Sequence, residues 1–275
     1  MLPNKTISVV TVSYFSELTL LASLLDSLKL AAKILFERTA YRLDYYIIDN
    51  SVDEQYYASL KKLLAETTLG GSVRLQLIAS PANAGYGAGN NQINSRLNSD
   101  YHLILNPDVE LHLEALYQAV KYMEGNHDVA MLSPQIINQS TSYHVVKAYP
   151  DCFTLLLRYF NISLLNKRYA ERLSRYQCTN LGDIADKSVA LAGGCFLFVR
   201  TDWFNRIEGF DEYFFMYFED FDLSIRLRSH GNIAYVPQVM ISHAGGGVGR
   251  KTWRHHFLFA VSAIKFFNRY GWRLC

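Results

Sequence analysis

The amino-acid sequence predicts an α/β fold, with a mainly parallel central sheet flanked by helices. Three observations predict it. Short apolar runs rich in β-branched residues alternate with longer runs of helical periodicity through the first half of the chain. Half of the 275 residues are hydrophobic, which is enough for one large core. Strands that alternate with helices of this length are typical of a parallel sheet covered on both faces.

The elements of the first half follow in order. Residues 7–13 read as a buried strand, and residues 17–38 as a helix whose charged residues recur at helical spacing. Glycine, proline and asparagine turns set most later boundaries. Further strands are expected at residues 43–49, 74–79, 101–105 and 129–133, and further helices at residues 53–67 and 113–123, with a short one ending at residue 97.

The second half is less regular. Residues 136–187 show no clear period, which is typical of a lid, an acceptor-binding insert or variable surface. Strands are expected at residues 194–200 and 234–241, with a helix between them that ends at Gly231. A C-terminal helix is expected within residues 251–275. Since no repeat or linker is visible, we expect a single domain spanning residues 1–275.

Charge and cysteine content narrow the class of protein. A net charge of +2 excludes a strongly basic nucleic-acid binder. The four cysteines have no metal or disulfide spacing, and neither a signal peptide nor a membrane-spanning run is visible, so a cytoplasmic protein is expected. Basic and aromatic residues crowd the C-terminus. This mixture suits a segment that binds a membrane surface or a phosphate-bearing ligand, and it is equally typical of an ordinary amphipathic helix. The residues are Arg250, Lys251, Trp253, Arg254, His255, His256, Phe257, Phe259, Lys265, Phe266, Phe267, Arg269, Tyr270, Trp272 and Arg273.

Three carboxylates stand directly behind a block of large apolar residues. Glu219, Asp220 and Asp222 follow Phe214 to Phe218. An unpaired buried carboxylate costs several kcal/mol, so carboxylates held at such a place favour a general base or a metal ligand. The alternative is an ordinary helix start, where acids are also preferred.

Polar turns follow three of the expected parallel strands. They are Ser13-Tyr14, Asp49-Asn50-Ser51 and Asn106-Pro107-Asp108. Ligands of such sheets bind beyond the carboxyl ends of the strands, so these turns are expected to meet at one ligand. Asp49 suits a base edge or ribose hydroxyls, and Asp108 suits Mg²⁺ or Mn²⁺ on a diphosphate. For any one of these turns alone, an Asx-type loop or a helix cap is the more common explanation.

Two glycine-rich segments add candidate ligands. The cluster from Gly85 to Asn90 follows the third strand and lacks the last glycine of a dinucleotide-binding fingerprint, so it indicates only a close approach to a phosphate or sugar. His243 follows a strand and precedes glycines, and it could share a metal with Asp108. A lone histidine is more often a core or surface residue.

Six motifs in order resemble the inverting GT-A glycosyltransferases of family 2, within the bacterial rhamnosyltransferase-like branch. The resemblance covers nearly the whole chain. Its motifs are residues 9–14, 48–51, 83–91, 105–109, 192–195 and 217–223 with Arg226. It implies a GT-A fold in which residues 1–110 bind a nucleotide-diphospho-sugar, residues 111–250 bind the acceptor and catalyse, and residues 251–275 form the basic aromatic helix.

The resemblance also implies roles for individual residues. Asp220 would be the catalytic base, with Glu219 as its competitor, and Asp108 would bind the metal with His243. Asn106 replaces the first carboxylate of the usual Asp-x-Asp motif, a variant similar to the rhamnosyltransferase-like branch. The implied donor-binding residues are Thr11, Ser13, Tyr14, Asp49, Asn50, Asn83, Gly85, Gly87, Asn90 and Asn106, and the acceptor-binding residues are Gly193, Gly194 and Asp222. For Asp222, capping of the helix is the alternative to orienting the acceptor.

The resulting hypothesis is transfer of L-rhamnose from dTDP-L-rhamnose to a lipid-diphosphate-linked or oligosaccharide acceptor. The product would be a bacterial surface polysaccharide such as O-antigen, made at the inner face of the cytoplasmic membrane by a peripheral protein. One alternative is a nucleotidyltransferase, although residues 13–16 offer no glycine- and lysine-rich loop. The other is a non-catalytic sugar- or lipid-binding module.

Overall fold

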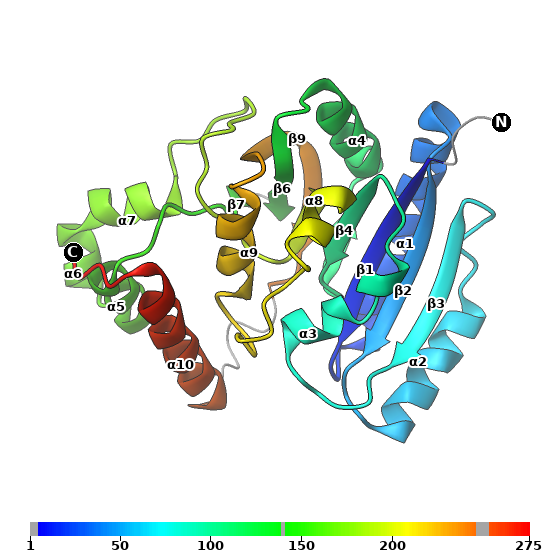
Figure 1. Cartoon of the computed structure of the whole chain (residues 1–275), viewed down its shortest axis with the longest axis horizontal. Helices are drawn as coiled ribbons and strands as arrows, with labels where there is room; N and C mark the ends of the chain where they lie inside the picture. Colours follow the sequence, from blue (N-terminus) through cyan, green and yellow to red (C-terminus); the bar gives the residue numbers. More distant parts are fainter. Residues whose placement is uncertain (1–4, 139–140, 246–252) are drawn as a thin grey trace.

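The computed structural model describes residues 5–138, 141–245 and 253–275. Within these residues a nine-stranded sheet has the order β3-β2-β1-β4-β8-β6-β9-β5, with β7 paired to β6 (Figure 1). The strands are β1 (Thr6–Ser13), β2 (Arg42–Asp49), β3 (Val73–Ala79), β4 (Tyr101–Leu105), β5 (Val109–Leu111), β6 (Val129–Asn138), β7 (Thr141–His144), β8 (Phe196–Arg200) and β9 (Asn232–His243).

Helices cover both faces of the sheet. The longest is α1, which packs its buried leucines against β1 and β2. The helices are α1 (Leu18–Thr39), α2 (Glu54–Glu66), α3 (Tyr86–Asn91), α4 (Ala115–Gly125), α5 (Cys152–Phe160), α6 (Ser163–Arg168), α7 (Ala170–Gln177), α8 (Thr201–Arg206), α9 (Glu219–Leu227) and α10 (Trp253–Tyr270). Helices α1, α2 and α4 share one hydrophobic cluster, while α8 and α9 belong to the cluster on the opposite face.

The first four strands in space are parallel, as the sequence predicts. The register pairs Ser13 with Asp49 and Asp49 with Ala79, so β1, β2 and β3 end at the same edge. Strand β4 lies parallel to β1 on its other side. This register brings the polar turns that follow β1, β2 and β4 to one edge of the sheet.

The rest of the sheet is mixed, which corrects the expectation of a mainly parallel one. Strand β8 runs antiparallel to both β4 and β6, and β5 runs antiparallel to β9. Strand direction depends on the connection between strands, and a strand buried on both faces has the same apolar sequence either way.

Residues 136–187, expected to be irregular, contain β7 and helices α5, α6 and α7. In α5 the period is hidden because apolar residues lie on both sides. Leu155 and Leu157 are buried there, whereas Leu156 and Phe160 are exposed. Strand β5 and helix α8 also lie outside the sequence prediction, since segments of three and six residues carry little periodic signal.

The C-terminal helix packs partly against the protein. Phe266 and Phe267 of α10 are buried in a third cluster with Phe214 and Phe218, whereas Trp253 and Phe257 at its start are exposed. In Figure 1, α10 lies with α5 and α6 to one side of the sheet. Arg250 and Lys251 of the predicted basic segment, and two glycines that follow His243, lie outside the described residues. In the described part of the chain, none of the helices is both long and apolar enough to cross a bilayer.

Candidate active site

Two adjoining cavities lie beyond the carboxyl ends of β1, β2 and β4. The first, here the strand-end cavity, has a volume of about 520 Å³. Its lining includes Tyr14, Phe15, Asn50, Asn83, Gly85, Tyr86, Asn106, Asp108 and Met216. The second, here the carboxylate cavity, measures about 350 Å³ and is lined by Tyr86, Asn106, Val145, Gly193, Gly194, Cys195, Met216, Tyr217, Glu219, Asp220 and His243. The shared lining residues make the two cavities one continuous cleft.

Asp220 is held at the carboxylate cavity by backbone donors. Its Oδ2 accepts from the Gly194 N–H at 2.9 Å, and its Oδ1 accepts from the Phe221 N–H at 2.9 Å. Burial raises the pKa of Asp220 to about 6, and these N–H groups and the nearby Lys147 charge limit the rise. The carboxylate is therefore oriented, ionised at neutral pH and close enough to neutrality to accept a proton.

Glu219 occupies a different environment from Asp220. It is 7% exposed, and its Oε2 has no hydrogen-bond partner in the described structure. Burial, together with the adjacent Asp220 charge, raises the pKa of Glu219 well above its ordinary value. Because two neighbouring carboxylates resist ionising together, Glu219 keeps its proton and Asp220 carries the charge. The geometry thus favours Asp220 as a base.

Asp108 and His243, the two predicted metal ligands, lie side by side. His243 Nε2 is 3.3 Å from Asp108 Oδ1, and both side chains are partly buried. Pairing of β5 with β9 sets Val109 opposite His243 and so brings the two together. Asp108 lines the strand-end cavity and His243 the carboxylate cavity, so the pair stands where the cavities meet.

Gly85 and Tyr86 join the two halves of the cleft. Gly85 has φ +106°, and a Cβ there would lie 2.2 Å from the Phe215 carbonyl oxygen, so only glycine fits. The Tyr86 N–H donates to that carbonyl at 2.9 Å. The Tyr86 hydroxyl lies 2.9 Å from Asn106 Oδ1 and 3.1 Å from the Gly194 oxygen. The sequence pattern does not single out Tyr86, although it stands inside the glycine cluster.

Asn50 and Asn83 form the floor beside this turn. Asn50 Nδ2 donates to Asn83 Oδ1 at 3.1 Å and to the Gly85 oxygen at 3.2 Å. The Oδ1 of Asn50 is buried without a hydrogen-bond partner in the described structure. A buried acceptor of this kind is available to a ligand that brings its own donor.

Several predicted donor-binding residues lie behind the cavity wall. Thr11 is fully buried and accepts from Tyr45, and Ser13 hydrogen-bonds Tyr56. Asp49 is 2% exposed and accepts from the Ser51 N–H. Gly87 packs on Phe210, and the buried Asn90 donates to the Tyr86 oxygen. Their roles in donor binding stay predictions. Their buried positions indicate that they support the residues that form the cavity wall.

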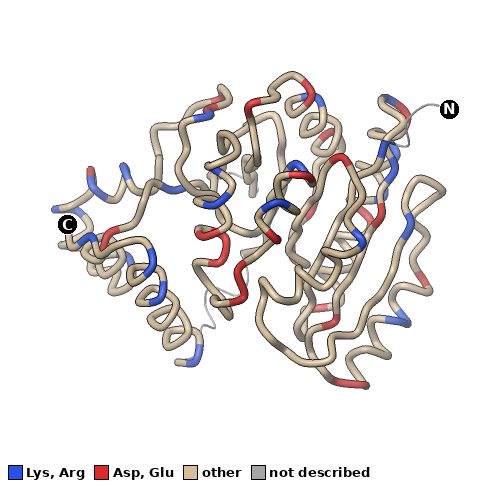
Figure 2. The backbone as a smooth tube through the Cα atoms, viewed as in Figure 1, with Lys and Arg blue, Asp and Glu red and all other residues tan. Residues whose placement is uncertain are grey.

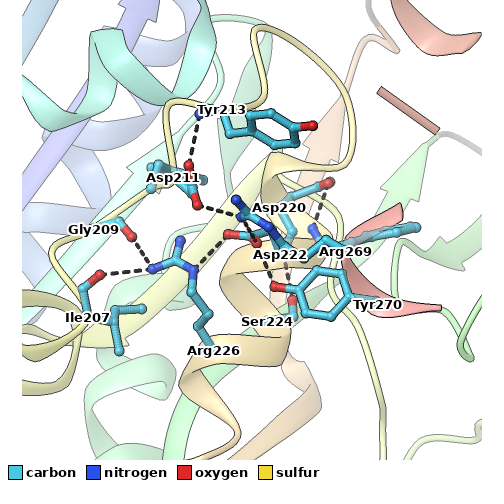
Figure 3. A network of polar contacts seen from close by, with 12 residues as sticks. Ile207, Gly209, Asp211, Tyr213, Asp220, Asp222, Ser224, Arg226, Arg269 and Tyr270 are labelled. Carbon is cyan, nitrogen blue, oxygen red and sulfur yellow. Dashed lines mark hydrogen bonds and ion pairs between the residues drawn. The ribbon is translucent and has the colours of Figure 1, made fainter. Parts of the chain in front are cut away.

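Asp222 lies away from the cleft in a network that fixes α10 on α9 (Figure 3). Its fully buried carboxylate accepts from Arg226 Nε at 2.7 Å, from the Tyr270 hydroxyl at 2.6 Å and from Arg269 at 3.1 Å. Arg226 also donates to the backbone oxygens of Ile207 and Gly209, and Arg269 to Asp211. Because these three donors already occupy the Asp222 carboxylate, the structure favours a structural role for Asp222 over the predicted contact with an acceptor. Gly193 and Gly194 do line the carboxylate cavity.

The sequence model of the family "Glycosyl transferase family 2" matches residues 8–207. The chain belongs to this family. The predicted GT-A fold is also confirmed by solved structures. The chain is similar to a mannosyltransferase of Pyrobaculum calidifontis in complex with GDP-Man and Mn²⁺, with a TM-score of 0.60 and 15% identity. This match covers 94% of the present chain and 64% of the mannosyltransferase. The chain is similar over 96% of its length, at 16% identity and a TM-score of 0.53, to S. aureus TarS 1–349 in complex with UDP-GlcNAc, covering 67% of that chain.

Curated relatives of this family 2 member include rhamnosyltransferases. It is 31% identical over 150 residues to "Rhamnosyltransferase WbbL" of Escherichia coli K12, a match that covers 52% of each chain. It is 46% identical over 54 residues, 19% of this chain and 17% of the other, to "N-acetylglucosaminyl-diphospho-decaprenol L-rhamnosyltransferase" of Mycobacterium tuberculosis. The chain thus spans about half the length of the first relative and less of the second.

Proposed function

We propose that this family 2 member is an inverting glycosyltransferase that moves L-rhamnose from dTDP-L-rhamnose to a hydroxyl of a lipid-linked or glycan acceptor. The observation that carries the proposal is the cleft itself. Asp220, an oriented carboxylate, lies in one cavity, and the Asp108–His243 pair stands where that cavity meets the next. The names of the curated relatives support rhamnose as the sugar.

The donor nucleotide is proposed to occupy the strand-end cavity. Tyr14 and Phe15 line it with half-exposed rings, which suit stacking on a base. Asn50 offers its unpaired Oδ1 to a donor group of the nucleotide. The diphosphate then lies toward Asp108, and the sugar toward the carboxylate cavity.

The transfer step uses Asp220 as general base. Its carboxylate takes the proton of the acceptor hydroxyl, whose oxygen bonds to the anomeric carbon as the bond from that carbon to the diphosphate oxygen breaks. Attack opposite the leaving group inverts the configuration, and the nucleoside diphosphate departs with the bonding electrons. Gly194, by donating to Asp220, orients the carboxylate for this transfer.

Asp108 and His243 are proposed to hold Mg²⁺ or Mn²⁺. Carboxylate oxygen and imidazole nitrogen are suitable donors, and within the described residues no group of three or more such side chains surrounds a common point. An ion held by these two residues would need further oxygen ligands, which a diphosphate and water could supply. When bound, the ion neutralises charge on the leaving diphosphate.

Screening of sugar nucleotides tests the proposal. With Mn²⁺ present, we expect dTDP-L-rhamnose to be hydrolysed or transferred at least about tenfold faster than dTDP-glucose, because pocket contacts of about 1–3 kcal/mol discriminate to that degree. Release of dTDP is measured. Binding of sugar nucleotides without any cleavage would instead favour the non-catalytic module, and release of pyrophosphate from a nucleoside triphosphate would favour the nucleotidyltransferase.

A lipid-linked acceptor and peripheral membrane association, as in O-antigen assembly, form the remaining part of the proposal. The described residues of α5, α6 and the start of α10 present exposed apolar side chains, among them Phe160, Leu164 and Trp253. Lys and Arg recur on α5–α7 and α10 (Figure 2). This mixture suits a surface of anionic lipid.

Flotation with anionic liposomes tests membrane association. Deleting α10 would remove Phe266 and Phe267 from the core, so point variants are preferable. The double variant Trp253→Ser and Phe257→Ser is expected to lower the floated fraction severalfold, because both exposed rings lose their apolar contact. Leu30→Ser with Leu113→Ser, exposed apolar residues elsewhere, is the matched control. Equal flotation of the wild type and the Trp253/Phe257 variant would contradict the proposed surface.

A further inference from the structure

A third cavity, of about 510 Å³, lies behind the carboxylate cavity. Its polar lining includes Gln135, Tyr143, His144, Lys147, Arg158 and Asp183. Val145 lines both this cavity and the carboxylate cavity. Arg158 lines it and also a small recess that contains Glu219 and Asp220. The third cavity shares no lining residue with the strand-end cavity, and Arg158 links it to the recess that contains Asp220.

Two cations line this cavity and form no ion pair within 4 Å among the described residues, although the Asp220 charge acts on Lys147 from a longer distance. Lys147 Nζ donates to the Val146 carbonyl oxygen at 3.0 Å, and among the described residues it forms no ion pair. The Arg158 guanidinium lies 5.2 Å from the Tyr176 ring centre, and in the described part of the chain it too lacks an ion pair within 4 Å. Asp183 lines the same cavity but does not pair with either cation.

The two cations differ in exposure, since Lys147 is partly buried whereas Arg158 is exposed to solvent. Burial, together with the charge of Arg158, lowers the pKa of Lys147 to about 8, and the Asp220 charge opposes this shift. Lys147 therefore remains mostly protonated at neutral pH, with two of its three N–H donors unused by the protein. The positive charges of Lys147 and Arg158 repel each other, and an anion bound between them would offset that repulsion.

We propose that Lys147 and Arg158 form a subsite for the phosphate of the acceptor. The inference rests on the proposed function and deepens it, since it gives the acceptor's chemical class as a sugar carried on a phosphate or diphosphate. The subsite adjoins Asp220, so the acceptor's anionic group is anchored on one side of the base while its sugar hydroxyl meets the base. Arg158 belongs to α5, whose outer side carries the exposed Leu156 and Phe160, so a lipid chain on that phosphate would leave along an apolar surface.

Direct binding measurements test the subsite. Geranyl diphosphate and inorganic pyrophosphate are titrated into the full chain by calorimetry, with EDTA present so that no metal-bridged binding occurs at Asp108. For Lys147→Gln combined with Arg158→Gln, we expect at least about tenfold weaker binding of geranyl diphosphate than for the wild type, because two charge-assisted contacts are lost. Lys147→Arg, which keeps the charge, is expected to bind nearly as the wild type does.

Controls and outcomes separate this inference from the proposed function. Arg175→Gln, an exposed cation on α7, is the matched control, and thermal unfolding checks that each variant is folded. Unchanged binding of geranyl diphosphate by the double variant would overturn the subsite, as would loss of pyrophosphate binding alone. Weakening of both probes supports it, because both carry the diphosphate, whereas weakening of geranyl diphosphate alone would place the lost contact on the lipid chain and would also overturn the subsite. Sugar-nucleotide cleavage by the wild type, measured beside these titrations, tests the proposed function separately.

Discussion

Asp220→Asn is expected to lower the turnover number about 10²- to 10⁴-fold, because that is the usual contribution of a positioned general base. The amide keeps the size of the side chain and can still accept from the Gly194 N–H, so the fold should persist. Donor binding should change little, because Asp220 lies outside the strand-end cavity. Steady-state kinetics with separate determination of kcat and donor KM measures both effects.

The pH profile adds a second readout of the same prediction. Burial raises the pKa of Asp220 to about 6, so the base is protonated and inactive below that pH and ionised above it. In the wild type, kcat should therefore rise about tenfold per pH unit below 6 and level off above it. Glu219→Gln is the matched control, because Glu219 already carries its proton and the amide resembles that form. An active Asp220→Asn beside an inactive Glu219→Gln would reverse the assignment.

Asp108→Asn is expected to lower kcat/KM about 10²- to 10³-fold at a fixed Mn²⁺ concentration, because charge stabilisation of the leaving group is worth several kcal/mol. The substitution removes one negative charge from the pair with His243 while keeping the side-chain volume. Part of the loss should be recovered as the Mn²⁺ concentration is raised, since a weakened site fills at higher concentration. Activity measured across a Mn²⁺ titration gives both quantities.

Glu110→Gln is the control for Asp108, because it removes an equal charge from the exposed side of β5. It should leave the Mn²⁺ titration unchanged. If Asp108→Asn and Glu110→Gln gave the same titration curve, Asp108 would have no part in metal binding.

Much of the cleft could be predicted from strand ends. A buried strand followed by a polar turn shows in the sequence, and parallel neighbours must bring such turns to one edge. That reasoning predicts that Asn50, Asn106 and Asp108 lie close together, and all three line the strand-end cavity. The carboxylates behind the aromatic block are equally visible, because an apolar run that stops at acidic residues is uncommon outside a site or a helix start.

Which way a side chain points could not be predicted so well. Thr11, Ser13 and Asp49 stand at the right strand ends, yet alternation along β1 and β2 turns all three toward the α1 and α2 face. Strands β1 and β2 are buried on both faces, so their sequences show no alternation from which that direction could be read.

Long-range partners are likewise hidden in the sequence. Asp222 stands two positions from Asp220, but Arg269 and Tyr270 of α10 bind its carboxylate from the far end of the chain. The third cavity depends on α5 and on the strand-like residues that precede it, in a stretch with no readable period. Only the folded chain brings Lys147 and Arg158 near Asp220.

A crystal structure of Asp220→Asn with dTDP-L-rhamnose and Mn²⁺ tests the central claim most directly. Anomalous scattering should locate Mn²⁺ against Asp108 and His243, with the nucleotide beside Tyr14 and Asn50 and the anomeric carbon facing position 220. Mn²⁺ bound elsewhere, or a sugar turned away from position 220 toward solvent, would contradict the account.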